Sequence, residues 1–260
     1  MTTAPPVTTG LPGLLRRGAQ TWHLATAVAV TVGLVWQAIL VVEGVNVLVD
    51  AGGSLPAVHT RLVNFASFFT IESNVLVAVT AAVLAVRPAA DGRVWRVLRL
   101  QALFGITVTG VVYSSLLRGV VDLHGAAAVT NALLHYVAPV LTVLGWLVFG
   151  PRPRITERTL VVSMTWPVAY VVWAFVHGAW SRWYPYPFVD VTKLGYPTVI
   201  RNGIGLVVFL VGVGALYRWL DQHLPPRFAT ARLAPAGGGT HPPPAPAPSS
   251  VEQGGEPRSG

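Results

Sequence analysis

The chain has no cysteine and few charged residues. Without cysteine it can form neither a disulfide framework nor a thiolate metal site, and it has no cysteine nucleophile. Charged residues make up only 11% of its 260 residues, about half the fraction found in an ordinary soluble domain. Apolar residues make up 53%. This balance indicates a chain that is surrounded by lipid rather than by water.

The few basic residues are distributed between apolar runs. A net charge of +8 would by itself suit a nucleic-acid-binding protein. Such a protein gathers its basic side chains on one solvated face, whereas here they flank long apolar segments. We therefore expect no nucleic-acid partner, and we expect the arginines to orient membrane-spanning helices.

Six apolar segments are long enough to cross a bilayer, which requires roughly 20 helical residues. They lie near residues 22–44, 61–86, 97–119, 129–150, 158–180 and 200–220. Each run must satisfy its own backbone hydrogen bonds in lipid, which a helix does and an isolated strand cannot. The sequence therefore predicts an all-α fold, a polytopic membrane helix bundle with six transmembrane helices.

The arginines predict the orientation of this bundle. Thirteen basic residues lie in the N-terminal segment, the second and fourth loops and the C-terminal region, and five lie in the other three loops and adjoining helix ends. Because cytoplasmic loops are enriched in arginine and lysine, both termini are predicted to be cytoplasmic. The predicted organisation is a cytoplasmic N-terminal segment (1–20), a six-helix transmembrane domain (21–222) and a disordered Pro/Gly-rich cytoplasmic tail (223–260).

Polar residues inside the second predicted helix are the most informative, because polar groups are costly in lipid. Asn64, Ser67, Thr70 and Asn74 are spaced by three, three and four residues and so share one helical face. Such residues commonly hydrogen-bond neighbouring helices. Glu72 lies off this stripe. Its carboxyl group must be protonated, paired or hydrated, and we considered both an ion pair with Arg118 or Arg201 and an ion-binding role.

The fourth predicted helix carries a second polar face. Asn131, His135, Pro139 and Thr142 follow at spacings of four, four and three residues. His135 lies about 15 Å and Thr70 about 13 Å from the outer ends of their helices, at ~1.5 Å of rise per residue. A hydroxyl next to an imidazole at one depth is the minimum for nucleophilic catalysis, although a structural hydrogen bond would need the same residues.

Three sequence motifs together resemble a known family. They are FFTIESN (residues 68–74), NALLHYVAP (131–139) and WYPYPF (183–188). In this order they resemble the androgen-inducible multipass membrane proteins and their actinobacterial relatives. The resemblance covers most of residues 20–220. Members of that family hydrolyse fatty acid esters of hydroxy fatty acids with a membrane-embedded threonine and a histidine. The resemblance implies Thr70 as the nucleophile, His135 as the base, and location in the cytoplasmic membrane of a bacterium.

The chain departs from that family in two respects. His135 stands alone where the animal proteins have a histidine-richer region, and Glu72 is a carboxylate not expected there. The predicted function is therefore the more general one of an intramembrane lipid ester hydrolase with a threonine nucleophile and a histidine base, whose partners are membrane lipids and a lipid ester substrate. Asn74, Asn131 and Glu72 are candidates for orienting His135 or stabilising an oxyanion.

Two other functions were weighed. One is a non-enzymatic carrier, channel or lipid-binding protein with Glu72 as its ion or proton site. The other is a metal or haem protein that uses His135, His177 and His124. These histidines form no clustered motif or paired positions. We therefore expect no metal and no cofactor.

Overall fold

The computed structural model describes residues 13–45, 54–120 and 122–227. The predicted tail lies outside the described residues from position 228 onward, as do the first twelve residues of the predicted N-terminal segment. The part of the chain that is described contains helices and one isolated β-bridge between Arg152 and Arg227, with no strand.

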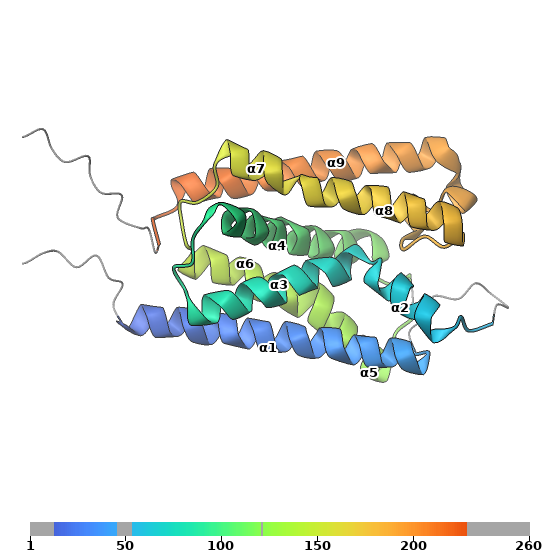
Figure 1. The fold of residues 1–260 in the computed structure, drawn as a ribbon, viewed down its shortest axis with the longest axis horizontal. Coiled ribbons are helices and arrows are strands. Elements are labelled where there is room, and N and C mark those ends of the chain that lie inside the picture. The colour runs from blue at the N-terminus through green and yellow to red at the C-terminus, as the bar shows by residue number, and fades with distance from the viewer. Residues whose placement is uncertain (1–12, 46–53, 121, 228–260) are drawn as a thin grey trace, which may run out of the picture. The chain divides into compact units, whose positions relative to one another are not determined.

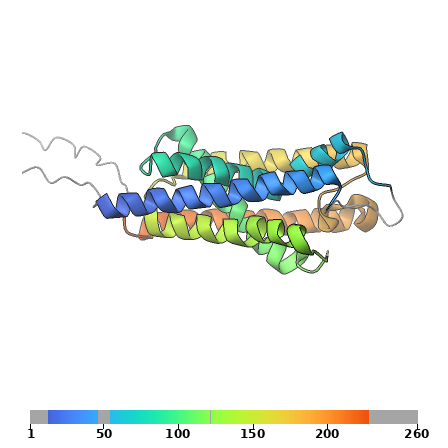
Figure 2. The same ribbon diagram turned by 90° about the horizontal axis from the view of Figure 1, so that it is seen from below.

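The helical elements are, in chain order, α1 (Gly13–Glu43), α2 (Val58–Ala66), α3 (Phe69–Val86), α4 (Arg93–Val112), the π-helical turn η1 (Tyr113–Leu117), α5 (Gly125–Ala132), the π-helical turn η2 (Leu133–Val137), α6 (Ala138–Phe149), α7 (Glu157–Ser163), α8 (Thr165–Ser181), the 3₁₀ turn η3 (Pro187–Val189) and α9 (Val191–His223). Their axes run nearly parallel in both views of the ribbon (Figures 1 and 2). The beginning of α1 and the end of α9 lie at the same end of the bundle (Figure 1).

Six helical segments of the described chain are long and apolar enough to span a membrane. They are Gly13–Glu43, Phe69–Val86, Arg93–Leu117, Gly125–Phe149, Glu157–Ser181 and Val191–His223. The prediction of an all-α polytopic bundle is thus confirmed. Large aliphatic side chains such as Ile204, Val207 and Val208 are exposed on the outside, whereas polar residues such as Ser73 and Asn74 are fully buried. This arrangement is that of an integral membrane protein, because lipid solvates the apolar exterior.

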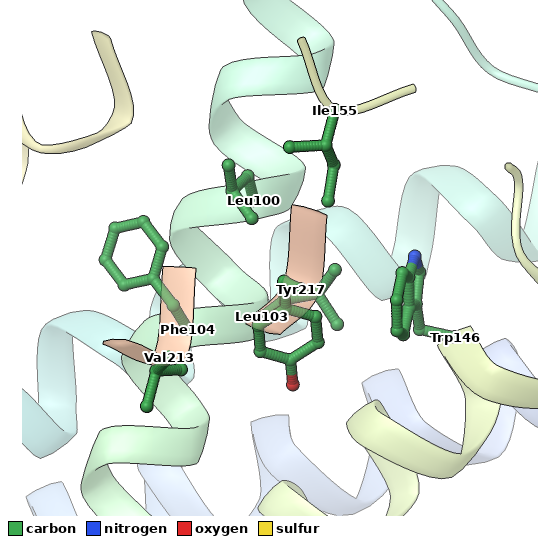
Figure 3. Packing of buried hydrophobic residues seen from close by; sticks show 7 residues of the cluster. All are labelled: Leu100, Leu103, Phe104, Trp146, Ile155, Val213 and Tyr217. Carbon is green, nitrogen blue, oxygen red and sulfur yellow. The ribbon is translucent and has the colours of Figure 1, made fainter. Parts of the chain in front are cut away.

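Apolar packing joins the helices of the bundle. Figure 3 shows one cluster of buried side chains, which comes from α4, α6, α9 and the segment before α7: Leu100, Leu103, Phe104, Trp146, Ile155, Val213 and Tyr217. Two glycines of α4 bring neighbouring helices close. A Cβ atom on Gly105 would lie 2.7 Å from the indole of Trp166, and one on Gly110 would lie 3.0 Å from the ring of Pro139. Their small size therefore places α4 against both α8 and α6.

The arginine-rich end of the bundle is held by charged groups. Asp91, in the loop before α4, accepts two hydrogen bonds from Arg96, at 2.6 and 2.8 Å, and pairs with Arg154. Asp221, near the end of α9, accepts hydrogen bonds from the backbone N–H groups of Arg154 and Ile155 at 2.6 and 2.7 Å. These contacts fix the loops that the positive-inside rule predicts to be cytoplasmic.

Several predicted helix boundaries were wrong. The single helix predicted for residues 61–86 is broken at Ser67 and Phe68 into α2 and α3. Helix α1 begins at Gly13 rather than near residue 22, because arginine side chains can extend from a helix end toward water. Helix α9 begins at Val191 rather than near residue 200. It is kinked at Gly195, whose φ is 73°, just before Pro197.

Candidate active site

Thr70 is the second residue of α3, directly after the break in the chain. The break is held by α8: the Trp173 indole N–H donates to Ser67 Oγ at 3.0 Å, and the Tyr170 hydroxyl donates to the Ser67 carbonyl oxygen at 3.2 Å. Phe68 is extended (φ −80°, ψ 128°), so α3 starts anew at Phe69. The backbone N–H of Thr70 therefore has no partner within its helix and is left for other groups.

His135 lies in the π-helical turn η2. Pro139 follows four residues later and has no N–H to donate to the His135 carbonyl oxygen, so the regular α-helical pattern is interrupted here. The Ala138 N–H donates instead to the carbonyl oxygen of Leu133, five residues back. Such π-helical turns often occur at functional sites. The interruption before Pro139 therefore takes the form of a widened turn that carries the histidine.

The structure brings Thr70 and His135 together, as the depth argument predicted. Thr70 Oγ1 lies 3.3 Å from His135 Nε2, and His135 Nδ1 lies 3.1 Å from the backbone carbonyl oxygen of Asn131. A carbonyl oxygen can only accept a hydrogen bond, so Nδ1 carries the proton of the neutral ring. Nε2 is then unprotonated and accepts the hydrogen bond from the threonine hydroxyl.

Tyr113, in the other π-helical turn η1, covers the imidazole of His135. The two ring centroids are 4.1 Å apart with an angle of 31° between the planes. The Tyr113 hydroxyl accepts a hydrogen bond of 2.7 Å from Asn131 Nδ2. The Asn131 side chain thus positions the tyrosine, whereas its backbone carbonyl positions the histidine. The sequence did not predict a role for Tyr113, because no spacing within its own helix relates it to Thr70 or His135.

Asn74 joins the two segments that carry the pair. Its Nδ2 donates to the backbone carbonyl oxygens of Thr70 at 2.8 Å and Leu134 at 3.2 Å. The residue is completely buried and lines neither of the two cavities described below. Its place is therefore behind the Thr70–His135 pair, where it holds α3 and η2 in register.

Glu72 points away from the pair. Its carboxylate accepts a hydrogen bond of 2.8 Å from the indole N–H of Trp166 in α8, and it lines neither cavity. Within the described chain it forms no ion pair with Arg118 or Arg201, so the pairing considered from the sequence is wrong. Arg118 lies at the end of η1 and Arg201 lies within α9, whereas Glu72 is hydrogen-bonded to Trp166 of α8.

Two cavities meet at the pair. The smaller, of about 200 Å³, contains Thr70 and His135 and is also lined by Arg61 and Asn64. The larger, of about 420 Å³, lies between α4, α8 and α9 and is lined almost entirely by apolar side chains. Four residues line both: Thr70, Tyr113, Leu117 and Tyr186. Thr70 therefore lies between the smaller cavity, which contains polar groups, and the larger, apolar cavity.

Tyr186 also lines both cavities, and the sequence did not predict its position. Its hydroxyl oxygen accepts a hydrogen bond of 3.3 Å from the backbone N–H of Thr70. Removal from water raises the pKa of Tyr186, although hydrogen bonds with Thr70 partly oppose this effect. The hydroxyl is therefore protonated and able to donate. The only feature of the sequence that could have indicated this residue is the WYPYPF motif (residues 183–188). Its aromatic residues are typical of a membrane interface and do not by themselves predict a contact with Thr70.

Neither His177 nor His124, the other two histidines considered as ligands, lines either cavity. His177 stacks on Trp173 and contacts the edge of Trp183, and His124 pairs with Asp122 in an exposed loop at 3.1 Å. Among the residues that the structure describes, no group of three or more histidine, cysteine, aspartate or glutamate side chains could hold a metal ion. The three histidines considered as metal or haem ligands are thus not gathered at one place.

No protein-family model, curated protein or solved structure matches the chain. The resemblance drawn from the three sequence motifs therefore stays a prediction. What the site can do chemically must be argued from its own residues. These are a hydroxyl on an imidazole, a tyrosine ring over that imidazole, a second tyrosine on the threonine backbone, and cavities on both sides.

Proposed function

We propose that this protein is an intramembrane lipid ester hydrolase in which Thr70 is the nucleophile and His135 the general base. The observation that carries the proposal is the 3.3 Å contact between Thr70 Oγ1 and the unprotonated Nε2 of His135 at the wall of two cavities. A threonine hydroxyl is a weak nucleophile at its own pKa, so it needs an adjacent base of this kind.

The reaction would proceed in two acyl-transfer steps. Thr70 Oγ1 attacks the ester carbonyl carbon while its proton passes to His135 Nε2. The resulting imidazolium then protonates the leaving alkoxide as the carbon–oxygen bond of the ester breaks. Water hydrolyses the acyl-threonine by the same proton transfers in reverse order. The carbonyl oxygen of Asn131 keeps the Nδ1 proton in place, and the Tyr113 ring face stabilises the positive charge of the imidazolium.

The two cavities suggest how an ester would lie. An apolar chain fits the larger cavity, whose walls include Ile204, Val207 and Val208 of α9. These three side chains are more than half exposed on the lipid-facing side of the helix, which favours lateral entry from the membrane. Water would reach Thr70 past the polar groups of the smaller cavity when no lipid chain fills it. The developing oxyanion would then be stabilised by the hydroxyl of Tyr186, next to the Thr70 backbone.

The geometry does not favour the alternative of a carrier centred on Glu72. A carrier would present this carboxylate to a path through the protein, but its carboxylate is bonded to Trp166 and lines neither cavity. Thr70 and His135 are among the polar residues that line the smaller cavity, whereas Glu72 is not.

The proposal is tested with purified full-length protein, a fluorogenic long-chain fatty acid ester and a fluorophosphonate probe. Wild type should hydrolyse the ester and become labelled, and mass spectrometry should place the adduct on Thr70. Thr70→Ala should lower kcat by at least about 10³-fold and abolish labelling, because the nucleophilic hydroxyl is gone. Thr70→Ser should keep part of both.

The matched control is Thr80→Ala in the same helix. Thr80 is also buried, and its hydroxyl donates only to backbone carbonyl groups of its own helix, at 2.8 and 3.3 Å. This variant should hydrolyse the ester as fast as wild type. Undiminished hydrolysis by Thr70→Ala, or an adduct on another residue, would contradict the proposal.

A further inference from the structure

Arg61 is a buried cation at the smaller cavity. Only 7% of its surface is exposed, and it lines the same cavity as Thr70 and His135. Arg61 is one of the five basic residues in or beside the loops predicted to lie outside. An arginine at such a position normally extends into water or toward lipid head groups. Its burial shows that it is directed into the protein instead.

One of the five guanidinium N–H donors of Arg61 has a defined partner. Nη1 donates to the carbonyl oxygen of Val41, in the last turn of α1, at 2.9 Å. Nη1 also lies close to Gly44, where a Cβ atom would be 2.9 Å from it, and the φ of 81° at this position favours glycine. The helix end therefore fixes the position of the side chain. The C-terminal end of α1 carries a partial negative charge of about half an elementary charge, which does not neutralise the full positive charge of Arg61.

The rest of the Arg61 side chain has no acidic partner in the described chain. Nε is buried without a hydrogen bond, and none of the ion pairs among the described residues includes Arg61. The carboxamide of Asn64, one helical turn later, also lines the cavity and has a buried Oδ1 without a partner. None of the described residues that line this cavity is an aspartate or glutamate. Burying an unpaired charge is costly, so such a site is suited to an anion.

The remaining walls are suited to an apolar chain. Phe65, Phe68, Leu117 and Trp183 line the cavity together with Arg61, Thr70 and His135. Arg61 lies in α2, and Thr70 lies in α3 beyond the break at Ser67 and Phe68. An occupant with a compact oxyanion at Arg61 would therefore extend an apolar chain along these walls.

We propose that Arg61 binds the carboxylate or phosphate head group of an amphiphile that occupies the smaller cavity. The guanidinium offers two parallel N–H donors, which match either oxyanion. This inference goes beyond the proposed function, because it concerns binding alone and holds whether or not Thr70 forms an acyl intermediate.

The test is equilibrium dialysis of purified full-length protein in an uncharged detergent with labelled decanoate, decyl phosphate and decanol. Wild type should bind both anions about ten-fold or more tightly than decanol, as expected for hydrogen bonds to a charged group. Arg61→Gln should lose this preference while its affinity for decanol changes less than about two-fold. Arg61→Lys should retain part of it, because lysine keeps the charge but not the paired donors.

Arg118→Gln is the matched control, because Arg118 is exposed at the end of η1 and lines neither cavity. Its anion preference should equal that of wild type. If Arg61→Gln does not fold, wild type alone gives the answer: decyl phosphate should protect Arg61 from phenylglyoxal, as mapped by mass spectrometry, and decanol should not. Measuring the same binding in Thr70→Ala, where it should persist, separates this proposal from the hydrolase proposal.

Three outcomes would overturn the inference. The first is equal binding of decanoate and decanol by wild type. The second is inorganic phosphate binding as tightly as decyl phosphate, which would indicate a site for a soluble anion. The third is an anion preference that appears only in Asp50→Asn, which would identify Asp50, a residue outside the described ranges, as the natural partner of Arg61.

Discussion

The Nδ1 atom of His135 lies 3.1 Å from the backbone carbonyl oxygen of Asn131, four residues earlier in the same helix. In a Ser-His-Asp triad the corresponding group is a carboxylate on a separate segment. Here the partner of Nδ1 is a neutral backbone carbonyl group in the turn that precedes η2, and this group orients the imidazole. The histidine is therefore held in one tautomer without a buried negative charge, whose burial in lipid would be costly.

This arrangement predicts that the side chain of Asn131 contributes less to kcat than its backbone carbonyl group does. Asn131→Ala removes the hydrogen bond to Tyr113 but leaves the carbonyl that accepts from His135. It should lower kcat by no more than about ten-fold, the cost of roughly one hydrogen bond. His135→Ala should lower kcat by at least about 10³-fold. Steady-state hydrolysis of the fluorogenic ester compares the two. Equal losses would mean that the amide itself contacts the reacting groups.

A second prediction concerns the coupling of Thr70 and His135. If they act as one unit, the double variant Thr70→Ala/His135→Ala should be at most a few-fold slower than either single variant, because each one alone already removes the nucleophilic attack. The measurement is a double-mutant cycle on kcat. Additive losses would assign the two residues to separate, structural roles and would contradict the hydrolase proposal.

A third prediction concerns Asn74, which holds the two segments together from behind. Asn74→Ala removes the two hydrogen bonds that the side chain donates to the carbonyl oxygens of Thr70 and Leu134. It should lower the free energy of unfolding by about 1–3 kcal/mol and reduce kcat by loosening the 3.3 Å contact. Thermal melting in detergent and ester hydrolysis measure the two effects.

The control for Asn74 is again Thr80→Ala, lower in the same helix. Its hydroxyl bonds only within α3, so a modest loss of thermal stability without loss of kcat is expected. If Asn74→Ala melted like wild type and kept its kcat, the proposed role in holding α3 against η2 would be wrong.

Part of this site could be predicted from the sequence. Hydropathy located all six spanning segments, because an apolar run of that length has one stable form in lipid. Helical rise predicted a shared depth for Thr70 and His135, although the count for Thr70 crossed the break between α2 and α3. The break after Ser67 was not predicted, because it depends on hydrogen bonds from Trp173 and Tyr170, about 100 residues away in sequence.

The remaining groups of the site arise from packing between distant segments. Tyr186 contacts the backbone of Thr70 from the loop between α8 and α9. Arg61 is directed inward, where its Nη1 donates a hydrogen bond to a carbonyl oxygen of α1. The direction of the Glu72 side chain likewise depends on its hydrogen bond with Trp166 in α8. The spacing of polar residues in α3 does not predict how α8 is rotated about its axis. Spacing within one helix could not have predicted any of these three contacts.

A fourth prediction is the orientation of the bundle in the membrane. The chain has no cysteine, so single cysteines can be introduced without removing native ones. Ser54 and Ser181 are exposed at one end of the bundle, and Ala89 is exposed at the other. Asp190 is less suitable, because it is 8% exposed and caps α9 through Thr192. An impermeant maleimide should label Ser54→Cys and Ser181→Cys in intact spheroplasts but not Ala89→Cys.

Permeabilised spheroplasts serve as the control for orientation, since Ala89→Cys should become labelled once the reagent can cross the membrane. Labelling of Ala89→Cys alone before permeabilisation would reverse the orientation. It would also place the smaller cavity and Arg61 nearer the cytoplasmic face.

The last prediction concerns Tyr186, whose hydroxyl lies 3.3 Å from the backbone nitrogen of Thr70. If this hydroxyl donates to the oxyanion, Tyr186→Phe should lower kcat by about 10²–10³-fold with little change in KM, because the interaction forms only in the transition state. Burial raises the pKa of Tyr186 above its ordinary value of about 10. A group with a raised pKa keeps its proton to higher pH, so the contribution of Tyr186 should stay constant through neutral and mildly alkaline pH.

The ratio of wild-type to Tyr186→Phe kcat, measured from neutral to alkaline pH, tests this. A constant ratio supports a protonated donor, whereas a ratio that falls to one near neutral pH would mean that the hydroxyl ionises in the working range. Tyr184→Phe is the control, because the neighbouring ring lines the larger cavity but is not hydrogen-bonded to Thr70. An equal loss in both variants would show that the loop stabilises the site only by packing, and Tyr186 would then be no oxyanion donor.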